Sequence, residues 1–281
     1  MTTLNTPWRI GGFELWQLAD GVLEIGVDKV LAPPERVAAR LAETGRTLPP
    51  RLPVNAFLIR REGRLALVDT GAGETMGPGL GALPGVLEGL GIDPAAIDTV
   101  MLTHVHPDHS NGLRLPGGAA RFPTAALVVH EADLAFWCDP GRVSDDPALR
   151  SRQEMARWQL APYAGRLRAF ATETEVFPGV TALPLPGHTP GHSGYLLADG
   201  GDRLLIWGDV THLPELQVPH PEAGMVFDID RAQAEATRRA VLARVASEGI
   251  TVAGMHLPGS GLGRVEAAGG GYHFVPVAAP G

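Results

Sequence analysis

The densest group of chemically active side chains is the hexapeptide HVHPDH, which begins at residue 104. On extended backbone, alternate side chains share a face, so His104 and His106 can reach one ion together. Pro107 ends the extended segment, and the turn that follows directs Asp108 and His109 to one side. Packing alone explains this cluster poorly, because each buried polar ring needs its own partner. The pattern therefore indicates a metal site, and the alternative is a polar surface loop.

Three further residues that can bind a metal each follow an apolar run: His188, Asp209 and His256. A glycine stands within two positions before each of them, and glycine permits the close backbone approach that a crowded metal site needs. Each residue alone is weak evidence, because a single His or Asp after a strand is more often structural. Their shared placement at strand ends, together with the first cluster, predicts one composite site.

Strands and helices that must position these residues recur along the chain. Strand-like apolar runs occupy residues 54–60, 64–70, 98–104, 125–130, 193–198, 203–208 and 251–256. Helical patterns occupy residues 34–43, 80–90, 147–160 and 230–247. Residues 13–22 end in the turn pair Asp20-Gly21 and are expected to begin a hairpin. Because both halves contain strands that end in metal-capable side chains, we expect two β-rich layers packed together and covered by helices.

The composition is that of a soluble globular protein, with 281 residues of which 44% are hydrophobic and 19% charged. A net charge of −8 and the absence of a Lys/Arg run argue against a nucleic-acid partner. No window reaches the ~18 apolar residues of a membrane span. The first residues do not read as a signal peptide, so we expect a cytoplasmic protein. The single cysteine, Cys138, excludes an intrachain disulfide and a thiolate-rich metal cage.

The motif THVHPDHSNG, with VDTG upstream and GHTPGHS, GD and a late histidine downstream, resembles the metallo-β-lactamase fold superfamily. The resemblance covers nearly the whole chain in order and spacing. It implies an α+β fold, an αββα sandwich of two mixed β-sheets flanked by helices, with a dinuclear metal site at one edge. Residues 1–281 would form a single domain, with a helical, aromatic-rich insert around 133–170.

The resemblance also implies a role for each residue that matches a motif. The first metal would be held by His104, His106 and His188, the second by Asp108, His109 and His256, with Asp209 bridging both. Asp69 of the DTG motif would orient a ligand histidine, since ligand imidazoles generally need such a partner, and the alternative is a turn-capping role. His192 is expected to support the site or the structure rather than to bind metal, because the GHTPGH motif already uses His188.

Within the superfamily, residues 54–60, 67–73 and 255–277 resemble the group that contains methyl parathion hydrolase and its lactonase-like relatives. This closer resemblance implies a homodimer. In that group a Phe-Trp pair at the place of Phe136-Trp137 belongs to a pocket region. We therefore expect Phe136, Trp137 and Trp158 to line an apolar substrate pocket, and the alternative is the core of a small helical subdomain.

The chemistry of this set of ligands agrees with the resemblance. Five neutral imidazoles and two carboxylates without a thiolate suit zinc, cobalt, manganese or iron rather than calcium or copper(I). Two divalent ions, two aspartates and a shared hydroxide leave a net charge of about +1, which favours a transition state that gains negative charge. Water bound to such ions titrates near pH ~7, so hydroxide is available to attack a carbonyl or phosphoryl centre.

The remaining histidines have no motif support and are interpreted as surface or internally satisfied residues: His130, His212, His220 and His273. Of these, only His212 calls for caution, because it lies three residues after Asp209.

Several competing functions can be weighed on the same residues. A Rossmann enzyme is disfavoured because the third glycine after Gly71 and Gly73 comes one position late, and no G-x-S-x-G elbow of a serine hydrolase is present. A nuclease or other phosphodiesterase would need a basic channel. A diiron oxidoreductase would replace a first-cluster imidazole, a sulfur dioxygenase would use fewer of these ligands, and a non-catalytic member would have lost some.

The sequence therefore predicts a dinuclear metal hydrolase, most consistent with zinc, that acts on a small-molecule lactone, ester or organophosphate triester. Lactone or aryl-ester opening is the first choice. The attacking hydroxide would bridge the metals, with Asp209 between them and Asp108 or a bound water assisting proton transfer.

Overall fold

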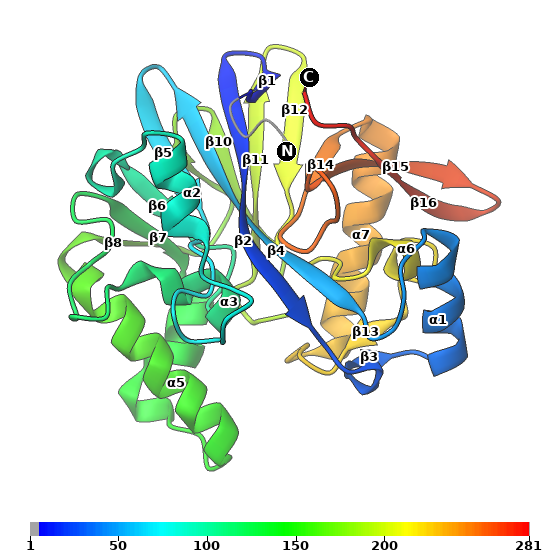
Figure 1. Ribbon diagram of the computed structural model, residues 1–281, viewed down its shortest axis with the longest axis horizontal. Helices are drawn as coiled ribbons and strands as arrows, with labels where there is room; N and C mark the ends of the chain where they lie inside the picture. Colours follow the sequence, from blue (N-terminus) through cyan, green and yellow to red (C-terminus); the bar gives the residue numbers. More distant parts are fainter. Residues whose placement is uncertain (1–5, 281) are drawn as a thin grey trace.

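Two β-sheets packed face to face form the middle of the computed structural model, which describes residues 6–280, and helices cover the outer face of each sheet (Figure 1). Sheet 1 has the order β1 (Trp8–Ile10), β2 (Phe13–Glu24), β4 (Arg51–Arg61), β5 (Arg64–Val68), β6 (Thr99–Met101), β7 (Ala126–His130) and β8 (Leu167–Phe170). The pairs from β5 to β8 are parallel and the others are antiparallel.

Sheet 2 is also mixed, because only its β12–β14 pair is parallel within the described residues. Its order is β16 (Gly271–Pro276), β15 (Leu262–Ala268), β14 (Thr251–Ala253), β12 (Asp202–Ile206), β11 (Ser193–Asp199), β10 (Val180–Pro184) and β9 (Thr174–Phe177). A small separate sheet pairs β3 (Val30–Leu31) with β13 (Gly224–Met225).

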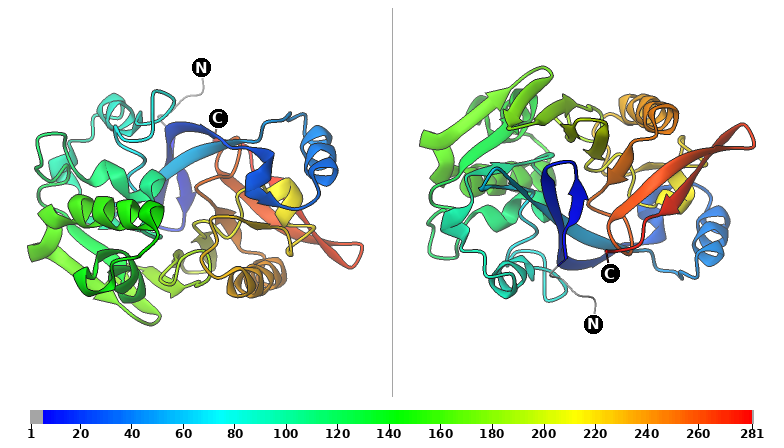
Figure 2. Two further views of the ribbon diagram at one scale, coloured as in Figure 1. Left: turned by 90° about the horizontal axis from the view of Figure 1, so that it is seen from below. Right: turned by 90° about the horizontal axis from the view of Figure 1, so that it is seen from above.

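The helices lie outside these sheets, as the two views along the vertical axis of Figure 1 show (Figure 2). Their bounds are α1 (Pro34–Glu43), α2 (Leu83–Gly89), α3 (Pro107–Ser110), α4 (Glu131–Asp133), α5 (Pro147–Leu160), α6 (Pro214–Gln217) and α7 (Arg231–Glu248). A π-helical turn spans Leu134–Cys138, and 3₁₀ turns span Val27–Lys29, Pro94–Ala96, Asn111–Leu113, Pro140–Arg142 and Ala161–Arg166. None of the helices in residues 6–280 is both long and apolar enough to cross a membrane. The α+β fold of two mixed sheets with flanking helices, predicted from the sequence, is confirmed.

Along the central strands of sheet 1, alternate side chains pack on opposite faces of the sheet, and both faces are buried. In β2, Phe13 and Leu15 pack between the sheets, whereas Trp16 and Leu18 face the helices. In β4, Phe57 packs inward and its sequence neighbours pack outward. Side chains two residues apart share a face of a strand, so a run that is apolar at every position fits a sheet covered on both sides.

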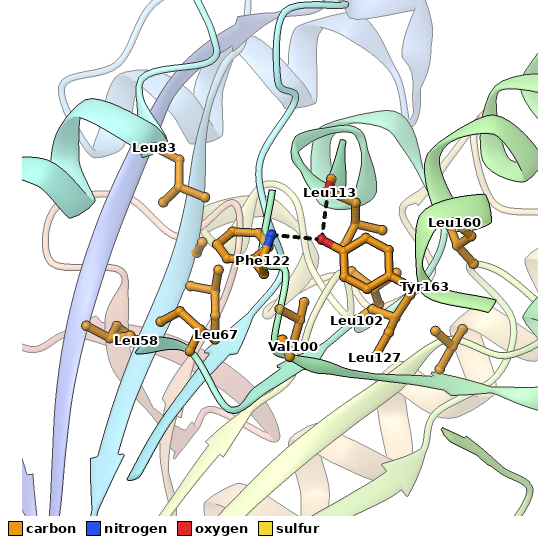
Figure 3. Close-up of a cluster of buried hydrophobic side chains, with 14 of the residues drawn as sticks. Leu58, Leu67, Leu83, Val100, Leu102, Leu113, Phe122, Leu127, Leu160 and Tyr163 are labelled. Carbon is orange, nitrogen blue, oxygen red and sulfur yellow. Dashed lines mark hydrogen bonds between the residues drawn. The ribbon is translucent and has the colours of Figure 1, made fainter. Parts of the chain in front are cut away.

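The helical segment between β7 and β8 is tied to the loop that follows α3 (Figure 3). The Tyr163 hydroxyl donates a hydrogen bond to the Leu113 carbonyl at 2.7 Å and accepts one from the Phe122 N–H at 3.1 Å. All three residues are fully buried. Because Leu113 lies just beyond α3, these bonds fix the position of the short helix that carries Asp108 and His109.

The predicted hairpin at Asp20-Gly21 is wrong. Strand β2 continues through this pair with a register shift against β4 and without reversing direction. The buried Asp20 carboxylate instead accepts hydrogen bonds from the backbone N–H groups of Ala72, Gly81 and Leu83. The Asp20-Gly21 pair therefore lies in a β-bulge rather than in a turn, and Asp20 binds the loop between β5 and α2.

Candidate metal centre

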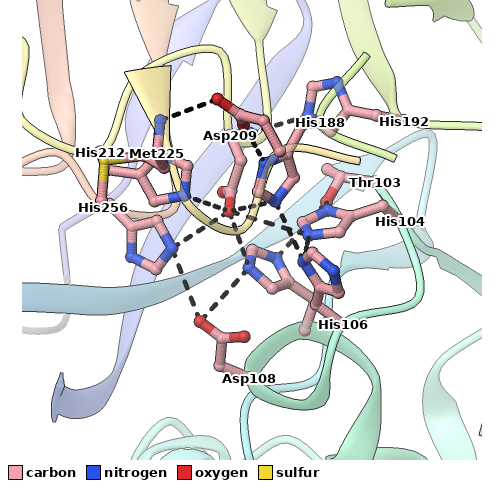
Figure 4. Close-up of polar contacts among 12 residues, drawn as sticks. Thr103, His104, His106, Asp108, His188, His192, Asp209, His212, Met225 and His256 are labelled. Carbon is pink, nitrogen blue, oxygen red and sulfur yellow. Dashed lines mark hydrogen bonds and ion pairs between the residues drawn. The ribbon is translucent and has the colours of Figure 1, made fainter. Parts of the chain in front are cut away.

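The seven residues expected to bind metal lie together in one cluster. Figure 4 labels all of them except His109. They come from five places: the segment after β6, helix α3, the β10–β11 connection, the end of β12 and the end of β14. One detail differs from expectation, because β6 ends at Met101, so His104 and His106 lie beyond the strand. His106 retains extended backbone, and α3 begins at the next residue and directs Asp108 and His109 toward the same centre.

The first group consists of three buried imidazoles whose nitrogens meet at hydrogen-bond distance. His106 Nδ1 lies 3.0 Å from His104 Nε2 and 3.0 Å from His188 Nε2. Each of the three side chains is less than a tenth exposed. Burial lowers the pKa of His104 and His106 well below the usual value, and the neighbouring imidazoles act in the same direction. The rings of His104 and His106 are therefore neutral, and each offers a lone pair.

The second group shares a carboxylate oxygen with the first. Asp108 Oδ2 lies 3.5 Å from both His109 Nε2 and His256 Nε2. Asp209 Oδ2 lies 3.4 Å from His109 Nε2 and 3.3 Å from His256 Nε2. The same Asp209 oxygen is 3.7 Å from His104 Nε2 and 3.4 Å from His188 Nε2. Asp209 thus stands between the two groups, as a bridging ligand must.

Outer partners fix which nitrogen of each ring faces the centre. His256 Nδ1 lies 2.8 Å from the Pro53 carbonyl, which can only accept, so this nitrogen carries a proton and Nε2 is the nitrogen that faces inward. His188 Nδ1 donates to Asp228 Oδ1 at 2.8 Å, which leaves Nε2 as the nitrogen that faces the centre. His109 Nδ1 donates to Asp69 Oδ2 at 2.7 Å. Such partners orient metal-binding imidazoles and make them more basic.

The orientation of the His104 ring is fixed by the hydroxyl of Thr103. Thr103 Oγ1 donates to Asp69 Oδ2 at 2.7 Å, so its oxygen accepts from His104 Nδ1 at 3.0 Å. His104 Nε2 therefore faces His106 without a proton. His106 Nδ1 lies 3.0 Å from both neighbours and can donate along only one of these contacts. Hydrogen bonds from His106 alone therefore cannot satisfy the other two ring nitrogens, whereas a cation between the three could be bound by all of them. The residues present fit a metal ion.

Charge around the second group leads to the same conclusion. Burial opposes ionisation of Asp209, but His109, His256 and His212 outweigh it and hold the Asp209 pKa well below its usual range. Burial likewise opposes protonation of His109, but the carboxylates of Asp209, Asp108 and Asp69 raise its pKa well above the usual value. In the metal-free protein, a proton on His109 therefore supplies the positive charge that these carboxylates require.

This proton leads to a pH-dependence that can be measured. Binding a metal at His109 Nε2 must displace the proton, since a ligand nitrogen needs its lone pair. The raised pKa means that the proton is present below that pKa and absent above it, so metal affinity is expected to rise with pH. Calorimetric titration of zinc in two buffers of different ionisation enthalpy should reveal proton release near pH ~7. An affinity that stays constant between pH ~6 and ~8 would contradict this.

Asp69 and His192 support the cluster from behind. Asp69 is buried and accepts hydrogen bonds from Thr103 and His109, and its backbone takes a left-handed conformation with φ of 60°. His192 Nδ1 donates to the Leu185 carbonyl, and its Nε2 accepts the backbone N–H of Asp209 at 2.8 Å. Burial lowers the pKa of His192 to about 3, which keeps Nε2 free to accept. His192 thereby holds the backbone of Asp209.

Asp228 is a supporting residue that the sequence did not reveal. It is buried, bonds His188 Nδ1 through Oδ1, and accepts the Met225 N–H through Oδ2 at 2.9 Å. Fully buried Arg238 lies 3.9 Å from Asp228 Oδ2 and donates to the Val210 carbonyl next to Asp209. Helix α7 thus supports both ligand-bearing loops from beneath, and no sequence motif marks either residue.

Replacing Asp228 with alanine is expected to weaken metal binding about 10–100-fold, because His188 loses the partner that fixes its tautomer. Competition with a chromophoric chelator measures this affinity directly. Asp228→Asn keeps the size and one acceptor, so it is expected to lose less affinity than the alanine variant. Equal affinity in the wild type and both variants would show that His188 needs no such partner.

His212 was interpreted as a residue outside the site, and that interpretation is wrong. Its side chain is 2% exposed, and Nε2 lies 3.1 Å from Asp209 Oδ2. The ring stacks on His256 with centroids 5.0 Å apart, and Nδ1 is buried without a hydrogen-bond partner in the described part of the chain. The sequence signal for a role of His212 in the site was its spacing of three residues from Asp209, but no motif supported it.

A hollow with about 550 Å³ of empty space, partly open to solvent, lies directly over the cluster. Phe136, Trp137 and Trp158 were expected to line it, and they do not. Trp137 is buried behind His106, with ring centroids 5.3 Å apart, and Phe136 packs on Trp137. Trp158 is 41% exposed beneath the guanidinium of Arg114. The alternative, a small helical core, describes Phe136 and Trp137 better.

Residues 49–256 match the family model described as the metallo-beta-lactamase superfamily. Curated relatives include an uncharacterized protein, YobT, of Bacillus subtilis, 27% identical over 167 residues, covering 59% of this chain and 65% of that protein. A probable metallo-hydrolase of Mycobacterium tuberculosis is 29% identical over 187 residues, covering 56% of each chain. An N-acyl homoserine lactonase of Bacillus thuringiensis is 26% identical over 184 residues, covering 58% of this chain and 66% of that protein. The chain therefore spans less than two thirds of the length of these relatives.

Two solved structures resemble this chain over its full length. The hydrolase AbOPH of the beta lactamase superfamily is 29% identical, covers 100% of both chains and has a TM-score of 0.93. AidC, described as a dizinc quorum-quenching lactonase, is 23% identical, covers 99% of both chains and has a TM-score of 0.91. The second similarity is one of fold.

Proposed function

The chain belongs to the metallo-beta-lactamase superfamily, and on that premise we propose that it is a dinuclear metal-dependent hydrolase that opens lactones or cleaves carboxylic esters. Organophosphate triesters are proposed as secondary substrates. The observation that carries the proposal is the position of Asp209 Oδ2, which faces imidazole nitrogens of both groups at 3.3–3.7 Å.

We assign one metal to His104, His106 and His188 and the other to Asp108, His109 and His256, with Asp209 shared. The nitrogen-rich donor set without thiolate suits zinc best, with cobalt, manganese or iron as alternatives. Two such ions, when bound, supply Lewis acidity toward the scissile carbonyl and lower the pKa of water at the site. The rings are held for this task by Asp69, Thr103, Asp228 and the Pro53 carbonyl, so ligand positions are set before substrate arrives.

The protein's own groups define the rest of the reaction site. Leu23, Leu52, Met76 and Phe227 line the hollow beside the cluster, and these side chains fit an acyl chain or an aromatic leaving group. Asp108 lines the same hollow, and its pKa is held below the usual range because His109 and His256 outweigh the effect of burial. Asp108 is therefore ionised and placed to accept a proton at Oδ1 or Oδ2.

The names of the relatives support hydrolysis, and one of them supports a lactone as the substrate. One curated relative is described as an N-acyl homoserine lactonase, and others as probable metallo-hydrolases. A nuclease or other phosphodiesterase finds less support, because phosphate backbones require a basic surface and the chain has a net charge of −8. The predicted homodimer and cytoplasmic location are not needed by this proposal and stay predictions.

A substrate panel tests the proposal. Purified protein loaded with zinc, cobalt or manganese is assayed on an acyl-homoserine lactone, dihydrocoumarin, an aryl ester, a paraoxon-type triester, a β-lactam and a phosphodiester. The highest kcat/KM is expected on the lactones or the aryl ester. Highest activity on the phosphodiester would favour the nuclease alternative, and no turnover of any substrate would favour a non-catalytic metal-binding protein.

A further inference from the structure

The hollow over the cluster contains one charged side chain that the metal centre does not use. Its lining includes members of the cluster, apolar side chains and Arg152 of α5. Asp108 and Asp209 are the carboxylates in the lining, and both belong to the cluster. A guanidinium beside apolar side chains, outside the cluster, is a specific chemical feature, because an apolar acyl chain alone gives it no partner.

The backbone at Arg152 is held firmly over the hollow. The next residue, Gln153, is 3% exposed and donates to the carbonyls of Phe136 and Arg142 at 2.8 and 2.9 Å. Its Oε1 accepts the Ser144 N–H at 2.9 Å. Helix α5 also contacts α3, the helix that carries Asp108 and His109. The position from which the Arg152 side chain extends is therefore fixed relative to the cluster.

The guanidinium of Arg152 is available, in contrast to those of its neighbours. Arg150 donates to the carbonyls of Ser144 and Asp145. Arg114 donates to the Trp158 carbonyl and stacks on the Trp158 ring. Arg152 is solvent-exposed, and its side chain forms no hydrogen bond or ion pair with any residue in the range 6–280. Arg152 thus contributes to the lining of the hollow a charge that forms no ion pair with a carboxylate of the described residues.

An unneutralised cation at the mouth of a cleft attracts anionic ligands, and the low-dielectric walls concentrate this effect. Arginine binds carboxylates through two parallel hydrogen bonds, which adds geometric selectivity to the attraction. The chain as a whole carries a net charge of −8 and therefore does not attract anions in general. The attraction that Arg152 exerts on an anion is local to the hollow.

We propose that Arg152 is a specificity-determining residue that binds a carboxylate carried by the substrate at a distance from the bond that is hydrolysed. The preferred substrates are then esters or lactones whose acyl part ends in a carboxylate, with the apolar walls contacting the methylene chain between the two ends. This inference rests on the proposed function, and it narrows the substrate class for the same site.

The test compares esters that differ only in this charge. The 4-nitrophenyl hemiesters of adipic, suberic and sebacic acid carry a terminal carboxylate, and neutral 4-nitrophenyl esters of matched chain length do not. For the zinc-loaded wild type, at least one hemiester is expected to have a lower KM than its neutral match. Arg152→Gln is expected to raise that KM about 10-fold or more, the effect of losing a hydrogen bond to a charged group, and to leave the neutral ester within about 2-fold.

Two control variants separate position from charge. Arg152→Lys keeps the charge without the paired geometry and is expected to fall between the wild type and Arg152→Gln. Arg168→Gln removes an exposed charge on β8, outside the hollow, and is expected to change neither KM. Equal changes for hemiester and neutral ester in Arg152→Gln, or no wild-type preference at any chain length, would overturn the inference.

A binding measurement keeps this inference separate from the proposed function. Adipate and hexanoate are titrated calorimetrically into the zinc-loaded wild type and Arg152→Gln proteins. Tighter binding of adipate by the wild type only is expected, since its second carboxylate reaches Arg152. If the wild type hydrolyses no ester, the proposed function fails, yet this titration still decides the inference. Equal ratios of the two affinities in both proteins would overturn it.

Discussion

Asp209→Ala is expected to lower kcat/KM for the best ester or lactone by about 10³-fold or more and to reduce bound metal below two ions per chain. The reason is the position of Oδ2, which faces nitrogens of both groups at 3.3–3.7 Å, and no other carboxylate in the described residues pairs with both groups. Removing the carboxylate also leaves five facing imidazoles without their shared negative neighbour. Elemental analysis and steady-state kinetics on the same preparation measure both effects.

Controls for this variant distinguish a lost ligand from a lost fold. The Asp209 N–H bonds to His192 through the backbone, so the alanine variant retains this anchor and is expected to remain folded by circular dichroism. Glu173→Ala, which removes an exposed carboxylate in the loop between β8 and β9, is expected to match the wild type in metal content and rate. Wild-type turnover by Asp209→Ala with less than one ion per chain would contradict the role of Asp209.

Removing the metals is expected to abolish hydrolysis and to lower the melting temperature by about 5–10 °C. Ions that bind only the folded state stabilise it by about 2.7 kcal/mol when present at 100 times their dissociation constant. For a chain of this size, each kcal/mol corresponds to a shift of about 2–4 °C. In addition, chelation leaves the nitrogens of His104, His106 and His188 close together without a cation between them.

Differential scanning calorimetry before chelation, after chelation and after adding zinc back measures this effect. Both the melting temperature and the activity are expected to return with zinc. A chelated protein that melts at the same temperature as the untreated protein would show that the cluster does not bind metal in the folded state.

Short-range pattern explains which parts of the fold could be predicted. Helices α1 and α5 occupy the residues predicted for them, because proline at the first turn and apolar periodicity are local signals. The hairpin at Asp20-Gly21 failed for the opposite reason. The same two residues suit a turn or a bulge, and only the distant loop bonded to Asp20 decides between them.

The residues of the site also divide into those that a local motif predicts and those that only the complete fold brings together. His104, His106 and Asp108 lie in one motif, so their convergence could be expected from six residues of sequence. Asp228 and the Pro53 carbonyl could not be identified, because one lies 40 residues from its histidine and the other is a backbone group without a side-chain signature. Both act only through contacts that the complete fold creates.

Residues of the hollow were the least predictable. Trp158 and Arg152 lie on the same helix, six positions apart, yet one is stacked beneath Arg114 and the other lines the hollow. Helical periodicity tells which residues share a face, but not which face is turned toward the metal centre. That depends on the anchoring of Gln153, which no local pattern reveals.

Anomalous diffraction from crystals of the zinc-loaded protein tests the central claim most directly. Data collected on both sides of the zinc absorption edge should show two peaks per chain. One is expected among His104, His106 and His188, the other among Asp108, His109 and His256, with Asp209 between them. A single peak, none, or peaks outside these residues would contradict the account of a dinuclear centre.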